Sequence, residues 1–237
     1  MKKWQTVVRE LSRAQKQARG VSLWSRYVNR PLGRVIAATA VVVGLSANGV
    51  TVISALTTVA GLAVLVTMPP GLASGLLVAV LLILGFALDS ADGQVARYTG
   101  TGSPAGEWLD HVVDAGKMVA VHAAVLVAWY RFELAPADAW YAVPLLYQLV
   151  AVVVFAGGTL APLLRRAPAG TAAPSTVRAI ALLPADYGVL ALSFATWGSP
   201  GLFRAVYSAL GLATLAIGAG LCAKWFRMLR SRQAAPR

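Results

Sequence analysis

Two short stretches of sequence decide how this chain folds: Asp89-Ser-Ala-Asp-Gly-Gln-Val-Ala-Arg97 and, after a gap of eight residues, Gly106-Glu-Trp-Leu-Asp-His-Val-Val-Asp114. They contain four aspartates at spacings of three and four residues, although the whole chain has only nine acidic residues. The surrounding sequence is apolar enough to form membrane helices. Ionised side chains at membrane depth are costly and usually functional. We therefore expect two neighbouring membrane helices that share one polar site.

Each stretch places a set of charged and small residues on one side of a helix that advances by about 100° per residue. These residues are Asp89, Asp92, Gly93, Ala96 and Arg97 on the first helix, and Gly106, Asp110 and Asp114 on the second. Four facing carboxylates repel one another at low dielectric unless cations lie between them, and oxygen ligands suit Mg²⁺ or Mn²⁺. Glycine lets a ligand approach the backbone, and arginine offers a fork for phosphate. The pattern predicts metal-assisted phosphoryl chemistry on a diphosphate.

The two stretches resemble the signature of the CDP-alcohol phosphotransferases, D-x2-D-G-x2-A-R-x8-G-x3-D-x3-D, in all eight fixed residues and every gap. The resemblance implies that Asp89, Asp92 and Asp110 bind two divalent cations, Mg²⁺ or Mn²⁺. It also implies that Asp114 is both a metal-site residue and the favoured general base. His111 is the alternative base, because the Asp110-His111 pair is similar to that of the ethanolamine and choline phosphotransferase branch.

The resemblance also implies where the substrates bind. The cytidine diphosphate would lie against Gly93, Ala96, Arg97 and Gly106, with Asn48 and Thr51 nearby. Asn48 and Thr51 could instead cap a helix N-terminus. The candidate acceptor-binding residues are Lys117, Arg165, Arg166, Arg178 and Asp186.

These acceptor assignments leave alternatives open. Lys117 could instead pair with Asp114, the three arginines could anchor the chain at the membrane, and Asp186 could cap a broken helix. Ala115 stands where many phosphatidyltransferases have arginine or lysine, so a pocket for inositol phosphate or glycerol phosphate does not transfer directly.

Composition places the chain among multi-pass membrane proteins. Of its 237 residues, 58% are hydrophobic, and the mean hydropathy is +0.67. The formal charge of +12 is concentrated beside apolar segments, which favours anionic lipid over nucleic acid as the partner. The single cysteine, Cys222, allows no internal disulfide. The N-terminal 34 residues are basic and lack the apolar core of a cleavable signal peptide.

Hydrophobic patterning predicts an all-α protein with six transmembrane helices, preceded by an N-terminal amphipathic and juxtamembrane region. The expected spans are about 48–67, 72–97, 104–130, 139–164, 178–197 and 201–223. Residues 1–19 are expected to form a basic amphipathic helix on the membrane surface, and residues 31–45 an interfacial helix. We thus predict three regions: cytoplasmic helices at 1–45, a transferase domain at 46–228 and a basic tail at 229–237.

The distribution of lysine and arginine predicts the orientation. With both termini in the cytoplasm, eighteen basic residues lie on the cytoplasmic side and only Arg131 and Arg204 lie opposite, while Lys117 falls within a span. We expect a multi-pass protein of the cell (inner or plasma) membrane whose active site opens toward the cytoplasm.

The predicted function is transfer of a substituted phosphate from a CDP-alcohol to an acceptor alcohol, with release of CMP, in phospholipid synthesis. CDP-diacylglycerol is the favoured donor, and a soluble CDP-alcohol with a lipid acceptor is the alternative. A divalent-cation transporter is a remote alternative, since such sites usually lie near the membrane midplane. The sequence does not identify the acceptor alcohol. It is compatible with a homodimer.

Overall fold

The computed structural model describes residues 2–13, 21–165 and 175–230, and these residues form helices and turns without strands. The α-helices are α1 (Lys2–Arg13), α2 (Arg30–Val43), α3 (Ala47–Thr67), α4 (Leu72–Thr99), α5 (Pro104–Arg131), α6 (Ala142–Arg165), α7 (Thr176–Ala181), α8 (Tyr187–Ser193) and α9 (Pro200–Arg230). A π-helical turn covers Ser25–Asn29, and 3-10 turns cover Asp138–Tyr141, Leu183–Ala185 and Phe194–Thr196.

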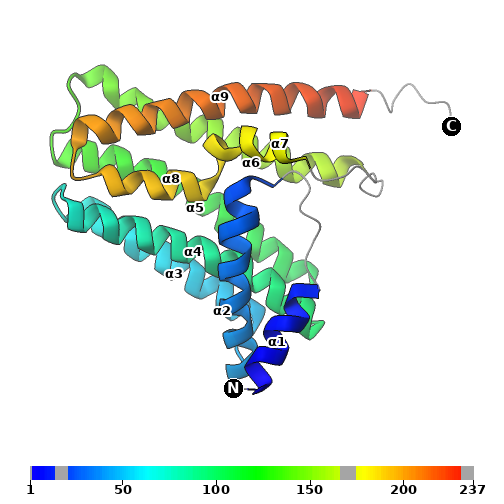
Figure 1. The fold of residues 1–237 in the computed structure, drawn as a ribbon. Coiled ribbons are helices and arrows are strands. Elements are labelled where there is room, and N and C mark those ends of the chain that lie inside the picture. Colours follow the sequence, from blue (N-terminus) through cyan, green and yellow to red (C-terminus); the bar gives the residue numbers. More distant parts are fainter. Residues whose placement is uncertain (1, 14–20, 166–174, 231–237) are drawn as a thin grey trace.

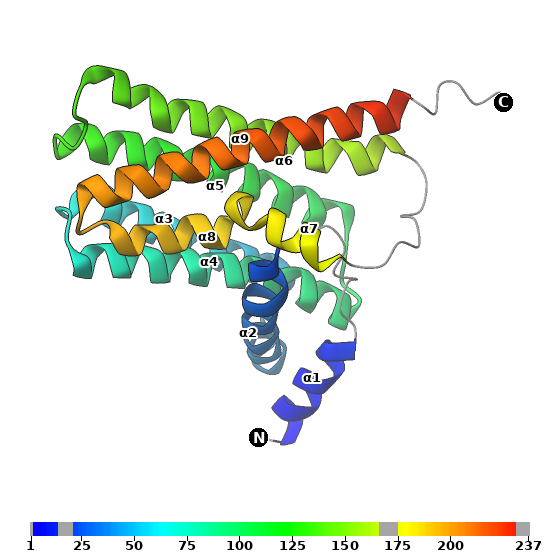
Figure 2. The same cartoon turned by 45° about the horizontal axis from the view of Figure 1, so that its top comes forward.

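Five helical segments of the described chain are long and apolar enough to cross a membrane: α3, α4, α5, the segment Asp138–Arg165 that ends in α6, and α9. They correspond to five of the six expected spans. The remaining one, the fifth along the chain, expected at 178–197, is not one helix in the described structure, so the count of six is not confirmed. Its longest apolar helical piece is Tyr187–Thr196. The α8 part of this broken segment still lies between α4 and α9 and runs toward the start of α9 (Figure 2).

Two residues explain the break. Pro184 lacks the backbone N–H that a continuous helix would use, and Asp186 has an extended backbone (φ −85°, ψ 133°) before α8 begins. The Asp186 carboxylate accepts a hydrogen bond from the backbone N–H of Gly188 at 2.7 Å. Asp186 is therefore the N-cap of α8, and the chain forms separate short helical pieces here instead of one continuous helix.

The long helices lie roughly side by side, whereas α2 lies across α4 (Figure 1). Gly33 makes this crossing possible, because a Cβ atom there would lie only 2.9 Å from the Cβ of Ser90. The crossing brings the N-terminal end of α2 against the part of α4 that holds the aspartates. α2 covers most of the stretch expected at 31–45 as an interfacial helix, and its position relative to a membrane stays a prediction.

Large buried aromatic residues hold the second half of the bundle together: Trp129, Phe194, Trp197, Phe203 and Tyr207. α8 and the turn after it contact α4 closely, since a Cβ at Gly75 would lie 2.8 Å from the Cβ of Trp197.

A helix, α1, covers Lys2–Arg13 within the stretch expected to form a basic amphipathic helix. Its position on a membrane surface stays a prediction, and residues 14–19 of the predicted helix lie outside the described residues. Val7 and Leu11 are buried in a cluster shared with α2, α3 and α4. Part of the apolar face of α1 therefore packs against protein.

Candidate active site

The turn between α4 and α5 brings the two signature stretches to one end of the bundle. Gly100 ends α4 with φ +68°, a conformation that glycine adopts without steric cost. Ser103 then caps α5, its hydroxyl accepting a hydrogen bond from the Gly106 N–H at 3.1 Å. Because the connection is so short, Asp89 and Asp92 near the end of α4 and Asp110 and Asp114 near the start of α5 come together.

Three of the four predicted metal ligands converge. One carboxylate oxygen from each of Asp89, Asp110 and Asp114 lies within 4.8 Å of the others. The buried ammonium group of Lys117 contacts Asp89 and lies 3.2 Å from Asp114 Oδ1. It also donates to the hydroxyl of Ser54 on α3 at 3.0 Å. This ammonium offsets part of the negative charge of the cluster.

The fourth aspartate, Asp92, is held by α3. It is 5% exposed and accepts a hydrogen bond from the Thr51 hydroxyl at 2.6 Å. The alternative that Asn48 or Thr51 caps α3 is wrong, because the N-cap is Ser46, whose hydroxyl accepts from the Gly49 N–H at 3.1 Å. Thr51 instead fixes the orientation of Asp92.

A cavity of about 200 Å³ lies beside the acids. Its lining residues are Arg30, Asp89, Ser90, Asp92, Gly93, Gln94, Arg97 and Asp110. A Cβ at Gly93 would lie 3.2 Å from an Arg97 guanidinium nitrogen, and one at Gly106 would lie 3.1 Å from Asn48 Oδ1. The small residues of the signature therefore leave room for polar groups. Ala96 is half-buried on α4 and is not part of this lining.

Arg30 is a member of this cavity that the sequence did not single out. It begins α2 and reaches the cavity because α2 crosses α4. Burial, together with the positive charges of Arg97 and Arg26, lowers the pKa of Arg30. Neighbouring guanidinium groups of this kind favour an anionic ligand such as a phosphate group.

His111 lies away from the three converging acids. Its Nε2 is 3.9 Å from Glu107 Oε1, and its side chain is 43% exposed. The structure therefore gives His111 a half-exposed position on α5, next to a solvated carboxylate.

The other candidate acceptor residues are spread out. Arg165 ends α6 and the exposed Arg178 lies in α7; neither belongs to the lining of the two cavities described here. Arg166 lies outside the described residues. Asp186 caps α8 and also accepts hydrogen bonds from the hydroxyls of Ser22 and Ser25, the latter at 2.6 Å.

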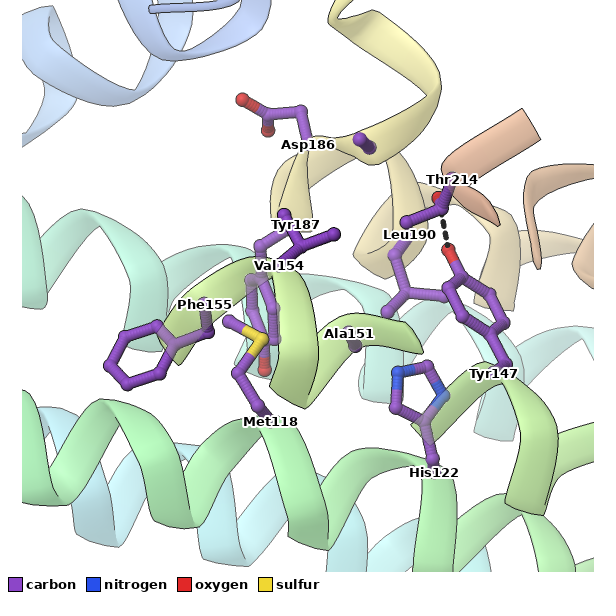
Figure 3. Close-up of a pocket in the computed structure, with 11 residues that line it drawn as sticks. Met118, His122, Tyr147, Ala151, Val154, Phe155, Asp186, Tyr187, Leu190 and Thr214 are labelled. Carbon is purple, nitrogen blue, oxygen red and sulfur yellow. Dashed lines mark hydrogen bonds between the residues drawn. The ribbon is translucent and has the colours of Figure 1, made fainter. Parts of the chain in front are cut away.

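A second cavity, of about 160 Å³, lies among α5, α6, α8 and α9 (Figure 3). Most of its lining is apolar, as the full set shows: Met118, His122, Tyr147, Ala151, Val154, Phe155, Ala185, Asp186, Tyr187, Leu190 and Thr214. Figure 3 shows the Asp186 carboxylate pointing away from the other lining residues, toward the N-terminal segment. His122 is buried, with Nδ1 2.6 Å from the Tyr207 hydroxyl.

The acid cluster fits divalent cations by its chemistry. All of its donor atoms are carboxylate oxygens, which hard ions such as Mg²⁺ and Mn²⁺ prefer. Asp89, Asp110 and Asp114 would hold such ions, with Asp92 beside them in the lining of the 200 Å³ cavity. The nearby ammonium of Lys117 shows that the cluster already accommodates positive charge.

Residues 44–218 match the family model of CDP-alcohol phosphatidyltransferase. This region contains α3 to α8 and both signature stretches, but not Arg30. No match was found among curated proteins. Because the family match covers well over half of the 237 residues, the chain belongs to the CDP-alcohol phosphatidyltransferase family.

Proposed function

We propose that this protein is an integral membrane transferase that uses CDP-diacylglycerol as donor and transfers its phosphatidyl group to an acceptor alcohol. Family membership supports the general reaction, phosphotransfer from a CDP-alcohol to an alcohol in lipid synthesis. The observation that carries the proposal is that two of the three converging acids, Asp89 and Asp110, lie in the wall of a cavity that Arg30 and Arg97 also line. Acids that can hold cations and arginines that can hold phosphate thus face the same space.

In the proposed reaction the acceptor oxygen forms a new bond to the β-phosphorus of the donor. The bond from that phosphorus to the oxygen bridging it to CMP breaks, and CMP leaves with the electron pair. Asp114 takes the proton of the acceptor hydroxyl and later returns it to solvent. Arg97 and Arg30 hold the diphosphate, while Thr51 keeps Asp92 in place. Two Mg²⁺ or Mn²⁺ ions, when bound, would neutralise charge on the diphosphate and on the departing CMP.

Release of CMP tests the proposal directly. Purified protein in vesicles should release CMP from CDP-diacylglycerol when a polar acceptor such as glycerol 3-phosphate or inositol 1-phosphate is added. Release from CDP-ethanolamine or CDP-choline with diacylglycerol as acceptor would support the alternative in which the lipid is the acceptor. Movement of Mn²⁺ into vesicles without CMP release would support the transporter instead.

The proposed orientation places the acid cluster on the cytoplasmic side. In a background with Cys222→Ala, Thr101→Cys in the α4–α5 turn should react with a membrane-impermeant maleimide only after cells are permeabilised. Ala137→Cys in the α5–α6 connection should react in intact cells. Both positions are exposed, so accessibility of the site alone does not separate them. The reverse pattern would show that the active site opens to the outside.

Arg97→Lys should weaken binding of CDP roughly tenfold, because the planar fork that can hold two phosphate oxygens is lost while the charge remains. Isothermal titration calorimetry with CDP and Mg²⁺ measures this change. Arg131→Lys is the matched control, since Arg131 is exposed at the far end of α5. Equal CDP affinity in Arg97→Lys and the wild type would remove Arg97 from the proposed diphosphate site.

A further inference from the structure

Tyr187, the first residue of α8, has a buried hydroxyl without a hydrogen-bond partner in the described structure. The residue is 8% exposed, and its ring packs on Phe86 of α4 with 5.2 Å between the ring centroids. A buried polar group left without a partner destabilises a protein, so its presence calls for an explanation. One explanation is a partner that arrives with the substrate.

The hydroxyl of Tyr187 points from α8 toward the part of α5 that carries Met118. Figure 3 shows the ring extending toward Met118 of α5, with the hydroxyl at its far end. Met118 lies one helical turn beyond Asp114, and the charges of Asp89 and Asp114 act on the Tyr187 hydroxyl. An O–H donor in the lining of the second cavity thus lies within the electrostatic influence of these carboxylates.

The side from which the acceptor oxygen approaches the phosphorus of the donor matters for the proposed reaction. Tyr187 lines the second cavity and not the cavity of Arg30 and Arg97. In phosphoryl transfer the attacking and leaving oxygens lie roughly in line on opposite sides of phosphorus. If CMP leaves from the cavity of Arg97, the acceptor oxygen has to approach from a different side.

We propose that Tyr187 donates a hydrogen bond to the reacting oxygen of the acceptor alcohol, whose carbon skeleton enters the second cavity. This inference rests on the proposed transferase function. The acceptor hydroxyl donates its proton to Asp114 and accepts from Tyr187, which fixes the direction in which its lone pair points. A second polar atom in the cavity wall, the buried and unpartnered Nε2 of His122, can bind another polar group of the same ligand. The apolar remainder of the lining suits uncharged carbon atoms.

Tyr187→Phe tests this assignment, because it removes only the hydroxyl. The assay measures CMP release from CDP-diacylglycerol with glycerol 3-phosphate, inositol 1-phosphate and diacylglycerol as probe acceptors. We expect kcat/KM for the accepted alcohol to fall on the order of tenfold or more. Calorimetric affinity for CMP with Mg²⁺ should stay unchanged, and the melting temperature should stay equal or rise, because an unpartnered buried group has been removed. Tyr141→Phe, in the 3-10 turn that follows the opposite end of α5 from the acids, is the matched control.

A second variant tests the cavity itself. Ala151→Leu on α6 should fill part of the cavity and raise KM for the acceptor, again without changing CMP affinity. Val153→Leu is its control, on the same helix with an exposed side chain. Wild-type acceptor kinetics in both Tyr187→Phe and Ala151→Leu, or a loss of CMP affinity in either, would overturn the inference while leaving the transferase function in place. A wild-type protein that releases no CMP with any probe would overturn both.

Discussion

Asp110→Asn should abolish CMP release, lowering the rate on the order of a thousandfold or more, while the protein still folds. Carboxylate ligands of a catalytic cation supply several kcal/mol of charge stabilisation, and each 1.4 kcal/mol corresponds to about tenfold in rate. Asp110 is the best acid to change first. Its charge acts on Asp92 and Asp114, so the substitution relieves repulsion within the cluster. Asp89→Asn, in contrast, weakens the contact with Lys117 and should also lower the melting temperature.

The measurement pairs activity with metal binding. Binding of Mn²⁺, followed by electron paramagnetic resonance, should weaken in Asp110→Asn independently of any substrate. Asp138→Asn is the matched control, because Asp138 is exposed in the turn before α6, away from the cluster. Full CMP release by Asp110→Asn, or by the wild-type protein in excess EDTA, would contradict the role assigned to the cations.

The long helices could be predicted from the sequence because apolar length and turn residues are local signals. Met68-Pro-Pro-Gly71 separates α3 from α4, and Gly100 to Ser103 separates α4 from α5, as the observed helix ends show. The helical period placed Asp110 and Asp114 on one stripe, and they are together in the structure. These features depend on neighbours within a few residues in the chain.

The fifth expected span shows where composition misleads. Residues 178–197 are apolar, and apolar length alone does not separate a continuous helix from a set of short ones. The local signals of the break are Pro184 and Asp186, although from the sequence Asp186 could equally line an acceptor pocket or cap a broken helix. The hydroxyls of Ser22 and Ser25 favour this break, since they help satisfy the Asp186 carboxylate. Those contacts join residues more than 160 positions apart, which no local pattern reveals.

Residues that reach the site only through helix packing could not be predicted from the sequence either. Ser54 contacts Lys117 from α3, and Arg30 reaches the cavity only because Gly33 lets α2 cross α4 closely. In the sequence, Arg30 is one basic residue among nine in the first 34 positions. The angle of a helix crossing depends on side chains of both helices, so the position of Arg30 could not be read from either one alone.

Asp114→Asn should reduce turnover by about 10²–10⁴-fold, the usual contribution of a positioned proton transfer, and His111→Ala should cost much less. The geometry favours Asp114 as the base. Asp114 belongs to the converging acids, whereas His111 is half-exposed beside Glu107. Both residues lie on α5, so a general disturbance of that helix would affect the two variants alike.

The pH dependence separates the two bases. If His111 took the proton, the rate would fall at acidic pH, because a protonated ring can no longer accept a proton. That fall would disappear in His111→Ala, whose rate would already be low. With Asp114 as the base, His111→Ala keeps the wild-type profile. The decisive measurement is kcat against pH for both variants at saturating Mg²⁺ and donor, with CMP affinity measured alongside. A near-normal rate in Asp114→Asn, together with a profile flattened by His111→Ala, would assign the proton to His111, since only the residue that accepts the proton can remove that part of the profile.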